Sequence, residues 1–577
     1  MNPPPSNRPV LGIDLGTTNT CVAIVGDDPA GRVLPNAEGE LTTPSVVFFA
    51  EDGTATVGKH AVAEMDRDPG RVVTLIKREM GRDGYTVGAG AGTWYPQQVS
   101  ALILRKVVED ALACLGRPVP VEGPIADAVI TVPAYFGTAE RKATVDAGKL
   151  AGLNVLDIVN EPTAAALAHG LRGGAGGRTV LVYDLGGGTF DVTIVRVLPA
   201  EVRVEVTGGD ARLGGEEWDR RLADLVLKKL DEIDPDDDPR TDAGLMTRLM
   251  LQVEAIKIRL SEATACRFRV RTPDGSTESI TIGRDEYEEA TEHLLGRTMD
   301  FTGDLLDQAR RKGVTVIDDV LLVGGMARSP AVARRLAEQF PDLPAARPPG
   351  DAEHIVARGA ARMAARAANG RGRDEPSTGR TASDRVRDEP STGRTASGWV
   401  RDEPSTGRTA SGWVRDEPGT GRTSGREPNA DIPVVRDVTS KGYGVMVVRD
   451  FHRPRDGRAL LWMIEPNTRV PTKRHDVVRT VHHDQRRMTI DVYESKTDVL
   501  TDNVEDHVRL AETRLEGLPE GLAKGYEVEL DFEFGADGIL RIQAHAANGA
   551  ALRLEIRING EMPPQEWDKP LPPGSCR

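Results

Sequence analysis

The sequence predicts a multidomain protein: a two-lobed α/β domain, a disordered linker with repeats, and a small antiparallel β-sandwich. Residues 10–366 alternate apolar strands with helical patterns, as in α/β architectures. From residue 373 the chain changes to short repeats that lack apolar residues for a core. Beyond 431, apolar and polar residues alternate with the period of strands. Because 577 residues exceed what one core organises, several domains are expected.

The α/β region contains the same turn twice, in VLGIDLGTTNT at 10–20 and VLVYDLGGGTFDVTIV at 180–195. Each copy is an apolar strand ending in Asp-Leu-Gly, then a turn rich in Gly and Thr, then a second strand. Such turns let backbone N–H groups approach a phosphate, and Asp14 and Asp184 stand where a metal and a phosphate meet. One copy could be an ordinary hairpin, whereas two copies favour a nucleotide held between two halves of the fold.

Two further strand-to-helix units complete this region. DAVITVPAYF at 127–136 predicts a strand that leads into a helix. The stretch 318–340 predicts a strand, a Gly-Gly turn, and a helix with Ser329 as N-cap and Pro330 at its first position. Gly324 and Gly325 then lie beside a helix N-terminus, which is a natural anion contact.

The linker contains copies of one motif that begin at Arg373, Arg387 and Arg401, a spacing of 14 residues. Each copy has Pro, Gly and mixed charge, so residues 367–430 are expected to be disordered. In each copy an Arg stands three residues before a Ser, a pattern of basophilic kinase sites. Those serines are Ser383, Ser397 and Ser411. An expanded repeat without a regulatory role is the alternative.

The last folded region, 431–560, is predicted as antiparallel β-structure. The stretches 488–495, 526–546 and 552–560 alternate with period 2, and Asp537-Gly538 forms a hairpin turn inside the second. Residues 561–577 form a Pro-rich tail.

Composition excludes several function classes. A formal charge of −15 argues against nucleic-acid binding and against anionic membranes. No apolar run reaches the roughly 18 residues of a membrane span, and the N-terminus lacks a signal-peptide core. The four cysteines are dispersed without a CxxC pair, so neither a zinc site nor a disulfide framework is expected. A monomer in a bacterial cytoplasm is predicted.

Several motifs in 10–366 together resemble the Hsp70 (DnaK-like) chaperones. They are GIDLGTTNTCVA, AVITVPAYF, AGLNVLDIVNEPTAAALAHG, VYDLGGGTFDV, GDARLGGEEWD, VEAIKIRLS and VGGMARSP, in order and suitably spaced. The resemblance implies an actin-like ATPase domain, residues 1–366, whose two lobes close over ATP and Mg²⁺, followed by a peptide-binding β-sandwich. Implied partners are unfolded or extended peptides, a J-domain co-chaperone and a nucleotide-exchange factor.

The resemblance also assigns roles to residues. Its phosphate contacts would be Gly16, Thr17, Thr18 and Asn19 from one lobe and Gly186, Gly187, Gly188 and Thr189 from the other. Asp14, Asp184 and Asp191 would hold Mg²⁺ through water, as suits an ion that dehydrates reluctantly. Lys77 and Glu161 would be catalytic with Asp14, Asp184 and Thr189, and Pro133 would switch between nucleotide states. Without the match, Lys77 reads as a surface lysine, Pro133 as a strand terminator and Glu161 as a helix-start carboxylate.

For the base and ribose, the resemblance points to two sets of residues. One helix would provide Glu254, Lys257 and Ser261, and the opposite side Gly324, Gly325 and Arg328, with Gly214 and Gly215 completing the pocket. Spacings of three and four place the helix residues on one face, where an ion pair on a solvated surface is the alternative.

In the β-sandwich, a cleft would take an extended peptide by main-chain hydrogen bonds and apolar pockets. The residues predicted to line it are Val445, Val448, Val478, Val481, Met488 and Ile490. Some of these could instead be sandwich core.

Four features depart from the family pattern. The chain ends 17 residues after Gly560, so the helical lid is expected to be absent. The interdomain linker IPVVRDVTS at 432–440 contains Arg436, whose burial without a partner would weaken coupling between domains. Arg141, an allosteric contact in the family, is present, but Val145 and Asp157 replace basic residues that receive J-domain partners. The region 442–462 is longer and more basic than the family arch.

The sequence therefore predicts an ATPase chaperone of the Hsp70 type that controls peptide binding by ATP hydrolysis. The alternative is an ATP-gated regulatory protein that holds one dedicated partner. A sugar kinase fits poorly, since the β-sandwich has no role in one.

Overall fold

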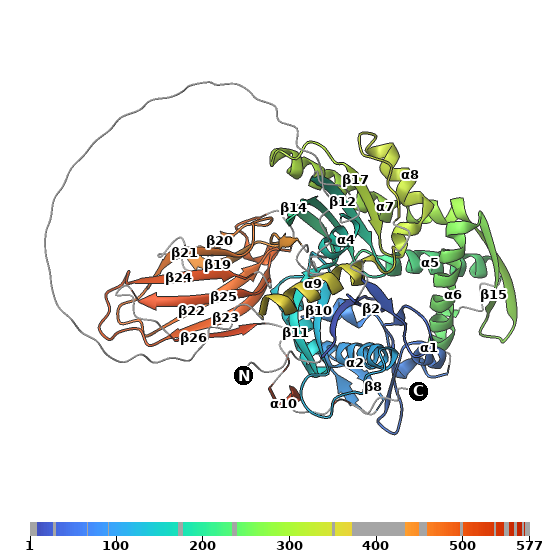
Figure 1. The fold of residues 1–577 in the computed structure, drawn as a ribbon, viewed down its shortest axis with the longest axis horizontal. Coiled ribbons are helices and arrows are strands. Elements are labelled where there is room, and N and C mark those ends of the chain that lie inside the picture. The colour runs from blue at the N-terminus through green and yellow to red at the C-terminus, as the bar shows by residue number, and fades with distance from the viewer. Residues whose placement is uncertain are drawn as a thin grey trace, which may run out of the picture.

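The chain folds into a two-lobed α/β domain with a β-sandwich docked at its side (Figure 1). The computed structural model describes residues 8–26, 31–65, 67–90, 92–170, 177–233, 239–348, 352–371, 433–448, 458–496, 500–535, 538–546, 553–558, 562, 564–567 and 571. The repeat serines and the tip of the 442–462 region lie outside the described residues. None of the helices in this described part combines the length and apolar character that a membrane crossing requires.

The first lobe is built on a six-stranded sheet with the order β11-β10-β1-β2-β3, with β4 paired to β2. Its strands are β1 (Val10–Leu15), β2 (Asn19–Ile24), β3 (Arg32–Leu34), β4 (Thr43–Pro44), β10 (Ala126–Val132) and β11 (Leu153–Asn160). β10 is buried along its whole length, and its run is apolar apart from Asp127 and Thr131. Helices α2 (Pro96–Cys114) and α3 (Thr138–Leu150) pack on the sheet, and a smaller part holds α1 (Lys59–Glu64), β5 (Val47–Phe49), β6 (Ala55–Val57), β7 (Val72–Val73), β8 (Val87–Ala89) and β9 (Gly92–Trp94).

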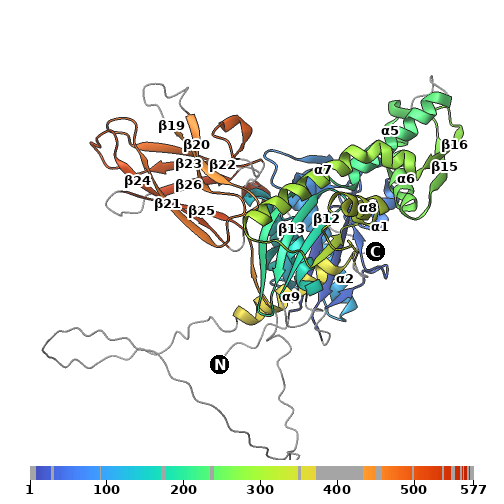
Figure 2. The same ribbon diagram turned by 90° about the horizontal axis from the view of Figure 1, so that it is seen from above.

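The second lobe repeats this plan around the sheet β17-β12-β13-β14-β18. Its strands are β12 (Arg178–Leu185), β13 (Phe190–Val197), β14 (Glu201–Asp210), β17 (Asp319–Val323) and β18 (Val434–Arg436). Figure 2 shows α7 (Arg284–Arg311) running over this sheet toward α5 (Gly215–Ile233), α6 (Ala243–Glu262) and the hairpin of β15 (Ala265–Arg271) and β16 (Thr277–Gly283). A large apolar cluster joins these elements to α8 (Pro330–Gln339).

Helix ends in this lobe follow the sequence signals. The Asp242 carboxylate accepts hydrogen bonds from the N–H groups of Gly244 and Leu245 at the start of α6. Ser329 is the N-cap of α8 and Pro330 its first residue, as predicted, although the Ser329 side chain makes no capping hydrogen bond.

Helices α4 (Glu161–Gly170) and α9 (Ile355–Arg371) pack on each other and on the sheets of the two lobes. A Cβ at Gly12 would collide with the backbone of Ala361, so this glycine permits α9 to lie directly on β1. α9 runs to Arg371, past the expected domain end at 366. The sequence places 434–436 in the sandwich region, but this segment forms β18 and pairs in parallel with β14 of the second lobe.

The β-sandwich consists of two antiparallel sheets, β20-β19-β22-β23-β26 and β21-β24-β25. The strands are β19 (Tyr443–Val448), β20 (Arg458–Ile464), β21 (Thr472–Arg479), β22 (Arg487–Glu494), β23 (Val508–Glu516), β24 (Glu527–Phe534), β25 (Leu540–Ala546) and β26 (Arg553–Ile558). Phe532 and Val492 are fully buried between the sheets. The hairpin predicted around Gly538 joins β24 to β25. In the tail, α10 (Pro564–Trp567) forms a single turn, and Leu571 packs against the core of the first lobe.

Candidate functional site

The first Gly-Thr turn lies between β1 and β2 and is fixed from below by Ser45. The Ser45 hydroxyl donates to the Gly16 carbonyl at 2.8 Å, and its N–H donates to the Thr18 carbonyl at 2.7 Å. These two hydrogen bonds hold the carbonyls of the turn in place without any ligand.

The second turn, between β12 and β13, is fixed by the start of α5. The N–H groups of Gly215 and Glu216 donate to the carbonyls of Gly186 and Gly187, both at 2.9 Å. A Cβ at Gly187 would collide with Thr18 of the first turn. The two turns therefore face each other from opposite lobes. They are close enough for one phosphate chain to contact both.

Four charged side chains lie between the turns. Lys77 donates to Glu161 at 2.5 Å, and both side chains are buried. Burial first, and then the charge of Glu161, raises the pKa of Asp14 to about 7. The same two causes, together with Asp191 and Asp14, raise the pKa of Asp184 well above its usual range. The cluster thus holds more negative charge than Lys77 neutralises.

Asp191 on β13 is buried and adds to this negative charge. Its carboxylate accepts the Tyr135 N–H at 3.0 Å, and burial, followed by the charge of Glu161, raises its pKa to about 8. An excess of buried carboxylates is the donor chemistry that a hard divalent cation balances. No three acidic, His or Cys side chains in the described part of the chain are close enough to ligate one ion directly. The oxygen donors of Asp14, Asp184 and Asp191 fit the ligand chemistry of an Mg²⁺ ion.

The opposite end of the cleft is formed by α6 and by the turn after β17. Lys257 donates to Asp219 at 2.8 Å and to the Gly215 carbonyl at 3.2 Å, which ties α6 to α5. Gly324 has φ +86°, and a Cβ there would lie 2.8 Å from the Asp184 carboxylate. Glycine is therefore required at 324 to bring this turn against the charged cluster.

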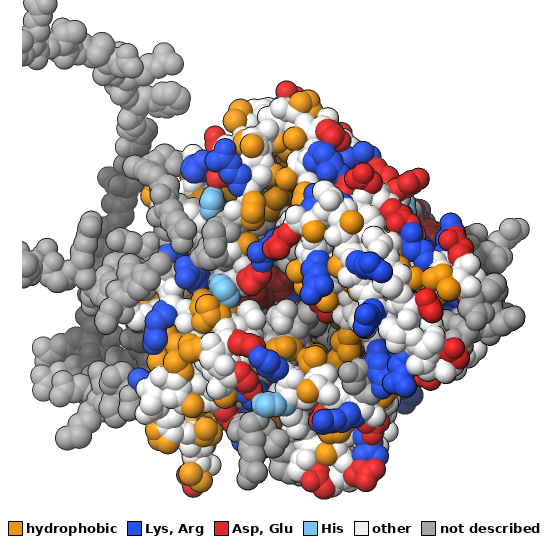
Figure 3. Space-filling model, turned by 90° about the vertical axis from the view of Figure 1, so that its right-hand side faces the viewer, with side chains coloured by type: hydrophobic (Ala, Val, Ile, Leu, Met, Phe, Trp, Pro, Cys, Tyr) orange, Lys and Arg blue, Asp and Glu red, His pale blue; other side chains and the backbone are white. Residues whose placement is uncertain are grey.

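These groups line one cleft of about 470 Å³ between the lobes. In the space-filling view this face is hollowed between the lobes, with acidic side chains at the bottom (Figure 3). The predicted residues that line it are Asp14, Gly16, Thr17, Thr18, Asn19, Lys77, Glu161, Asp184, Gly186, Gly187, Thr189, Gly215, Glu254, Lys257, Ser261, Gly324, Gly325 and Arg328. Gly188 and Gly214 instead pack against each other behind the second turn, and Asp191 is buried below it.

Sequence reasoning missed an ion pair that joins the lobes beside the cleft. Arg78, from the first lobe, bonds Glu216, and also Glu217 at 2.9 Å, at the start of α5. The signal was available, because Arg78 follows Lys77 and both glutamates follow Gly214-Gly215. Thr131 was also missed, and its hydroxyl donates to Asp14 at 3.0 Å.

The sandwich contacts the lobes through the segment that follows β10. Phe136 donates its N–H to the Pro133 carbonyl, which closes a turn around Tyr135. The Tyr135 hydroxyl donates to the carbonyl of Lys496 in the sandwich at 2.5 Å, while its N–H holds Asp191. This turn therefore touches the charged cluster on one side and the sandwich on the other.

The linker after the repeats is docked, contrary to the expectation for Arg436. Arg436 is largely exposed and pairs with Glu201 at 3.1 Å, so it carries no burial penalty. Asp437 is partly buried and accepts a hydrogen bond from the Asn160 amide at 2.7 Å, and Asn160 in turn accepts one from Arg141. The expected burial of Arg436 without a partner is wrong, because β18 leaves its side chain in solvent beside Glu201, while weakened coupling between the domains stays a prediction.

The residues predicted to bind peptide fall into two groups. Val445 and Ile490 are buried in the sandwich core, which agrees with the alternative reading for them. Val478 and Met488 are partly buried against that core, and Val481 is also partly buried. Val448 ends β19, and its side chain lies outside the described part. Val145 and Asp157 lie on α3 and β11, partly buried.

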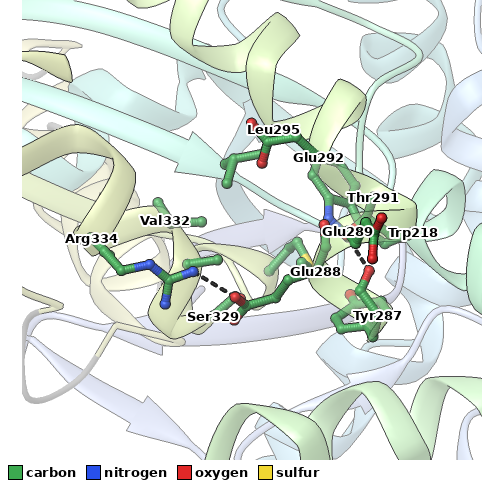
Figure 4. A pocket seen from close by; sticks show the side chains of 12 residues that line it. Trp218, Tyr287, Glu288, Glu289, Thr291, Glu292, Leu295, Ser329, Val332 and Arg334 are labelled. Atoms are coloured by element: carbon green, nitrogen blue, oxygen red, sulfur yellow. Dashed lines mark hydrogen bonds and ion pairs between the residues drawn. The ribbon is translucent and has the colours of Figure 1, made fainter. Parts of the chain in front are cut away.

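A smaller pocket of about 270 Å³ lies between α5, α7 and α8 (Figure 4). Trp218 and Leu295 form apolar walls, and an ion pair of Arg334 with Glu288 spans its edge at 2.5 Å. The buried Tyr287 hydroxyl has no hydrogen-bond partner in the described structure. None of the predicted site residues lines this pocket, which is separate from the phosphate turns.

Two lobes that each present a Gly-Thr turn and a carboxylate to one cleft, followed by a β-sandwich, define a nucleotide-binding protein with an appended β-domain. The family model described as Hsp70 protein matches residues 10–88, 85–374 and 424–569. The chain is also 34% identical over 544 residues to the chaperone protein DnaK of Thermotoga neapolitana, a match that covers 93% of this chain and 78% of that protein. The chain belongs to the Hsp70 family, as the motifs predicted, and the multidomain fold class is confirmed.

Members of the Hsp70 family share several general properties. The family is one of ATP-binding chaperones that act in protein folding, and its members are ATPases that generally use Mg²⁺. DnaK-like chaperones bind unfolded peptides and co-chaperones.

Proposed function

We propose that this chain is an ATP-dependent chaperone that hydrolyses ATP in the cleft between its lobes to control the binding of extended peptides by its β-sandwich. The observation that carries the proposal is the Lys77–Glu161 pair, which lies between two facing Gly-Thr turns and beside Asp14 and Asp184. Phosphoryl transfer needs positioning and charge stabilisation rather than a covalent intermediate, and this arrangement supplies both.

The roles follow from position. The backbone N–H groups of the two turns bind the β- and γ-phosphates, and α6 with Gly325 and Arg328 binds the base and ribose. The Lys77 ammonium stabilises charge on the transferred phosphoryl group, and Lys77 and Glu161 orient the water for in-line attack. Asp14, Asp184 and Asp191 would hold Mg²⁺ through water, which supplies charge neutralisation at the phosphates.

Control of the sandwich is proposed to pass through the turn at Pro133 and through the linker contacts of Arg141. This proposal is supported by the contacts of Tyr135 on both sides and by the docking of Asp437 on Asn160. Peptide binding at Val478, Val481 and Met488, response to a J-domain partner and a cytoplasmic location are further parts of the proposal.

The test of hydrolysis is Lys77→Ala, measured as single-turnover conversion of bound ATP. The expected loss is about 100-fold or more with ATP binding retained, because removing one preorganised charge typically costs that much. Lys59→Ala is the matched control, since Lys59 is an exposed lysine of the same lobe paired with Glu40. An unchanged rate in Lys77→Ala would show that the assigned mechanism is wrong.

The alternative function is a regulatory protein that holds one dedicated partner. A peptide-binding assay distinguishes it from a chaperone. A chaperone binds a fluorescent aliphatic heptapeptide and releases it on addition of ATP. A dedicated regulator retains the ATPase and does not bind the peptide.

A further inference from the structure

The N-terminus of α3 receives its capping carboxylate from the other domain. Gly137, the N-cap of α3, has no side chain to offer, and the Thr138 N–H donates to Glu494 of β22 at 3.3 Å. A Cβ at Gly137 would collide with both carboxyl oxygens of Glu494. Helix N-termini favour carboxylates through their free N–H groups and their dipole. Glu494 is therefore a contact that exists only while the domains are docked.

A buried lysine and a second glutamate complete this contact. Lys441, just before β19, is buried, with its Nζ 3.6 Å from the Tyr135 ring centroid and 3.4 Å from the Lys496 carbonyl oxygen. Burial lowers the pKa of Lys441, while the nearby Glu494 and Glu140 act to raise it. Glu140 lies on the first turn of α3, on the ATPase side of the interface. Lys441 is thus a cation whose charge acts on a carboxylate from each side of the interface.

The surrounding charges leave an excess negative charge. Beside this contact, Asn160 accepts a hydrogen bond from Arg141 on α3 and donates one to Asp437 in the linker, and Tyr443 on β19 is buried next to Glu494. The fields of Asp191 on β13 and Asp210 on β14 also reach Lys441. The carboxylates around the contact are those of Glu140, Glu494, Asp437, Asp191 and Asp210, and the cations are Lys441, Arg141 and Arg297, the last paired with Asp210. The carboxylates therefore outnumber the cations at this interface.

We propose that docking of the β-sandwich on the ATPase domain takes up one proton from solvent, held by the Glu494–Glu140 pair, so that docking strengthens as pH falls. With that proton in place, Lys441 balances the remaining carboxylate. When the domains separate, both carboxyl groups return to water and the proton is released. This linkage concerns the docking contact and does not depend on ATP hydrolysis.

The direction follows from Glu494. Burial, followed by the charge of Glu140, raises its pKa in the docked state to about 7, from an ordinary value of 4.5. A raised pKa gives stabilisation that is complete below the ordinary value and is lost as pH rises to the raised value. Burial raises the pKa of Glu140 as well. Lys441, whose pKa is lowered, stays charged below its docked pKa and contributes no slope there.

The test is the docking equilibrium of the full chain, measured by small-angle X-ray scattering at pH 6, 7 and 8, with and without ATP. These values lie above the isoelectric point of about 5.3. The docking constant is expected to fall about tenfold from pH 6 to pH 8. Glu494→Gln keeps a capping oxygen but cannot titrate in this range, so its docking constant is expected to be flat.

Two further variants keep the result interpretable. Glu516→Gln, an exposed carboxylate on the neighbouring strand β23, is expected to keep the tenfold fall. Lys441→Met removes the shared ammonium group and is expected to weaken docking at pH 8 and to steepen the pH dependence. A flat profile in the unmodified chain, or an unchanged tenfold fall in Glu494→Gln, would overturn the proposal.

Discussion

The contact between Gly214 and Gly188 gives a sharp test of how the second phosphate turn is positioned. A Cβ at Gly214 would lie 2.6 Å from the Gly188 backbone nitrogen and carbonyl carbon and 2.7 Å from its Cα. Ordinary Cβ contacts begin at 3.4 Å, so Gly214→Ala must displace the turn by about 0.8 Å. All three colliding atoms are backbone, so no side chain can rotate away to relieve the contact.

Gly214→Ala is therefore expected to slow ATP hydrolysis about 100-fold, which is the effect of a misplacement near 1 Å at a reacting group. The assay is single-turnover hydrolysis, with nucleotide affinity measured separately by calorimetry. Gly208→Ala is the matched control, because a Cβ there meets only the Leu305 side chain at 3.6 Å in the same lobe. A rate for Gly214→Ala within threefold of the unmodified chain would refute the role given to this turn.

Three other changes test the lobe contact, the linker and the sandwich. Arg78→Ala leaves Glu216 and Glu217 without their partner from the other lobe, so calorimetry is expected to show ATP binding weakened by about 5- to 150-fold, from a loss of roughly 1–3 kcal/mol; unchanged affinity would contradict the role of this pair. Asp437→Ala removes the acceptor of the Asn160 amide, so the docking constant from X-ray scattering is expected to fall by a similar factor, whereas the exposed Asp52→Ala should not change it. Phe532→Ala removes a fully buried ring, so the sandwich transition in calorimetry is expected to lose about 3–5 kcal/mol while the ATPase transition stays in place.

Much of the ATP site could be predicted from sequence because it is carried by local patterns. The turns at Gly16 and Gly186 each follow a buried strand, so the chain itself fixes both the turn and the preceding aspartate. Family motifs then supplied Lys77 and Glu161, which lie 84 positions apart and meet only after both lobes form.

Contacts between domains could not be predicted in the same way. The sequence predicts an energetic penalty for burying Arg436 in the linker contact. In the structure, the edge strand β18 exposes alternate side chains to solvent, so Arg436 is not buried. Glu494 and Gly137 are separated by most of the chain, and neither residue carries a local signal of a cap. The sequence pattern also does not separate core from cleft positions on alternating strands, and Val445 and Ile490 belong to the core.

The most direct test of ATP control over the sandwich is the release rate of a fluorescent aliphatic heptapeptide from the full chain, followed by stopped flow with and without ATP. The structure places Tyr135 and Asp437 between the cleft and the sandwich. ATP is therefore predicted to accelerate release about tenfold or more, a coupling typical of linked sites. A release rate that ATP does not change would contradict the proposed control.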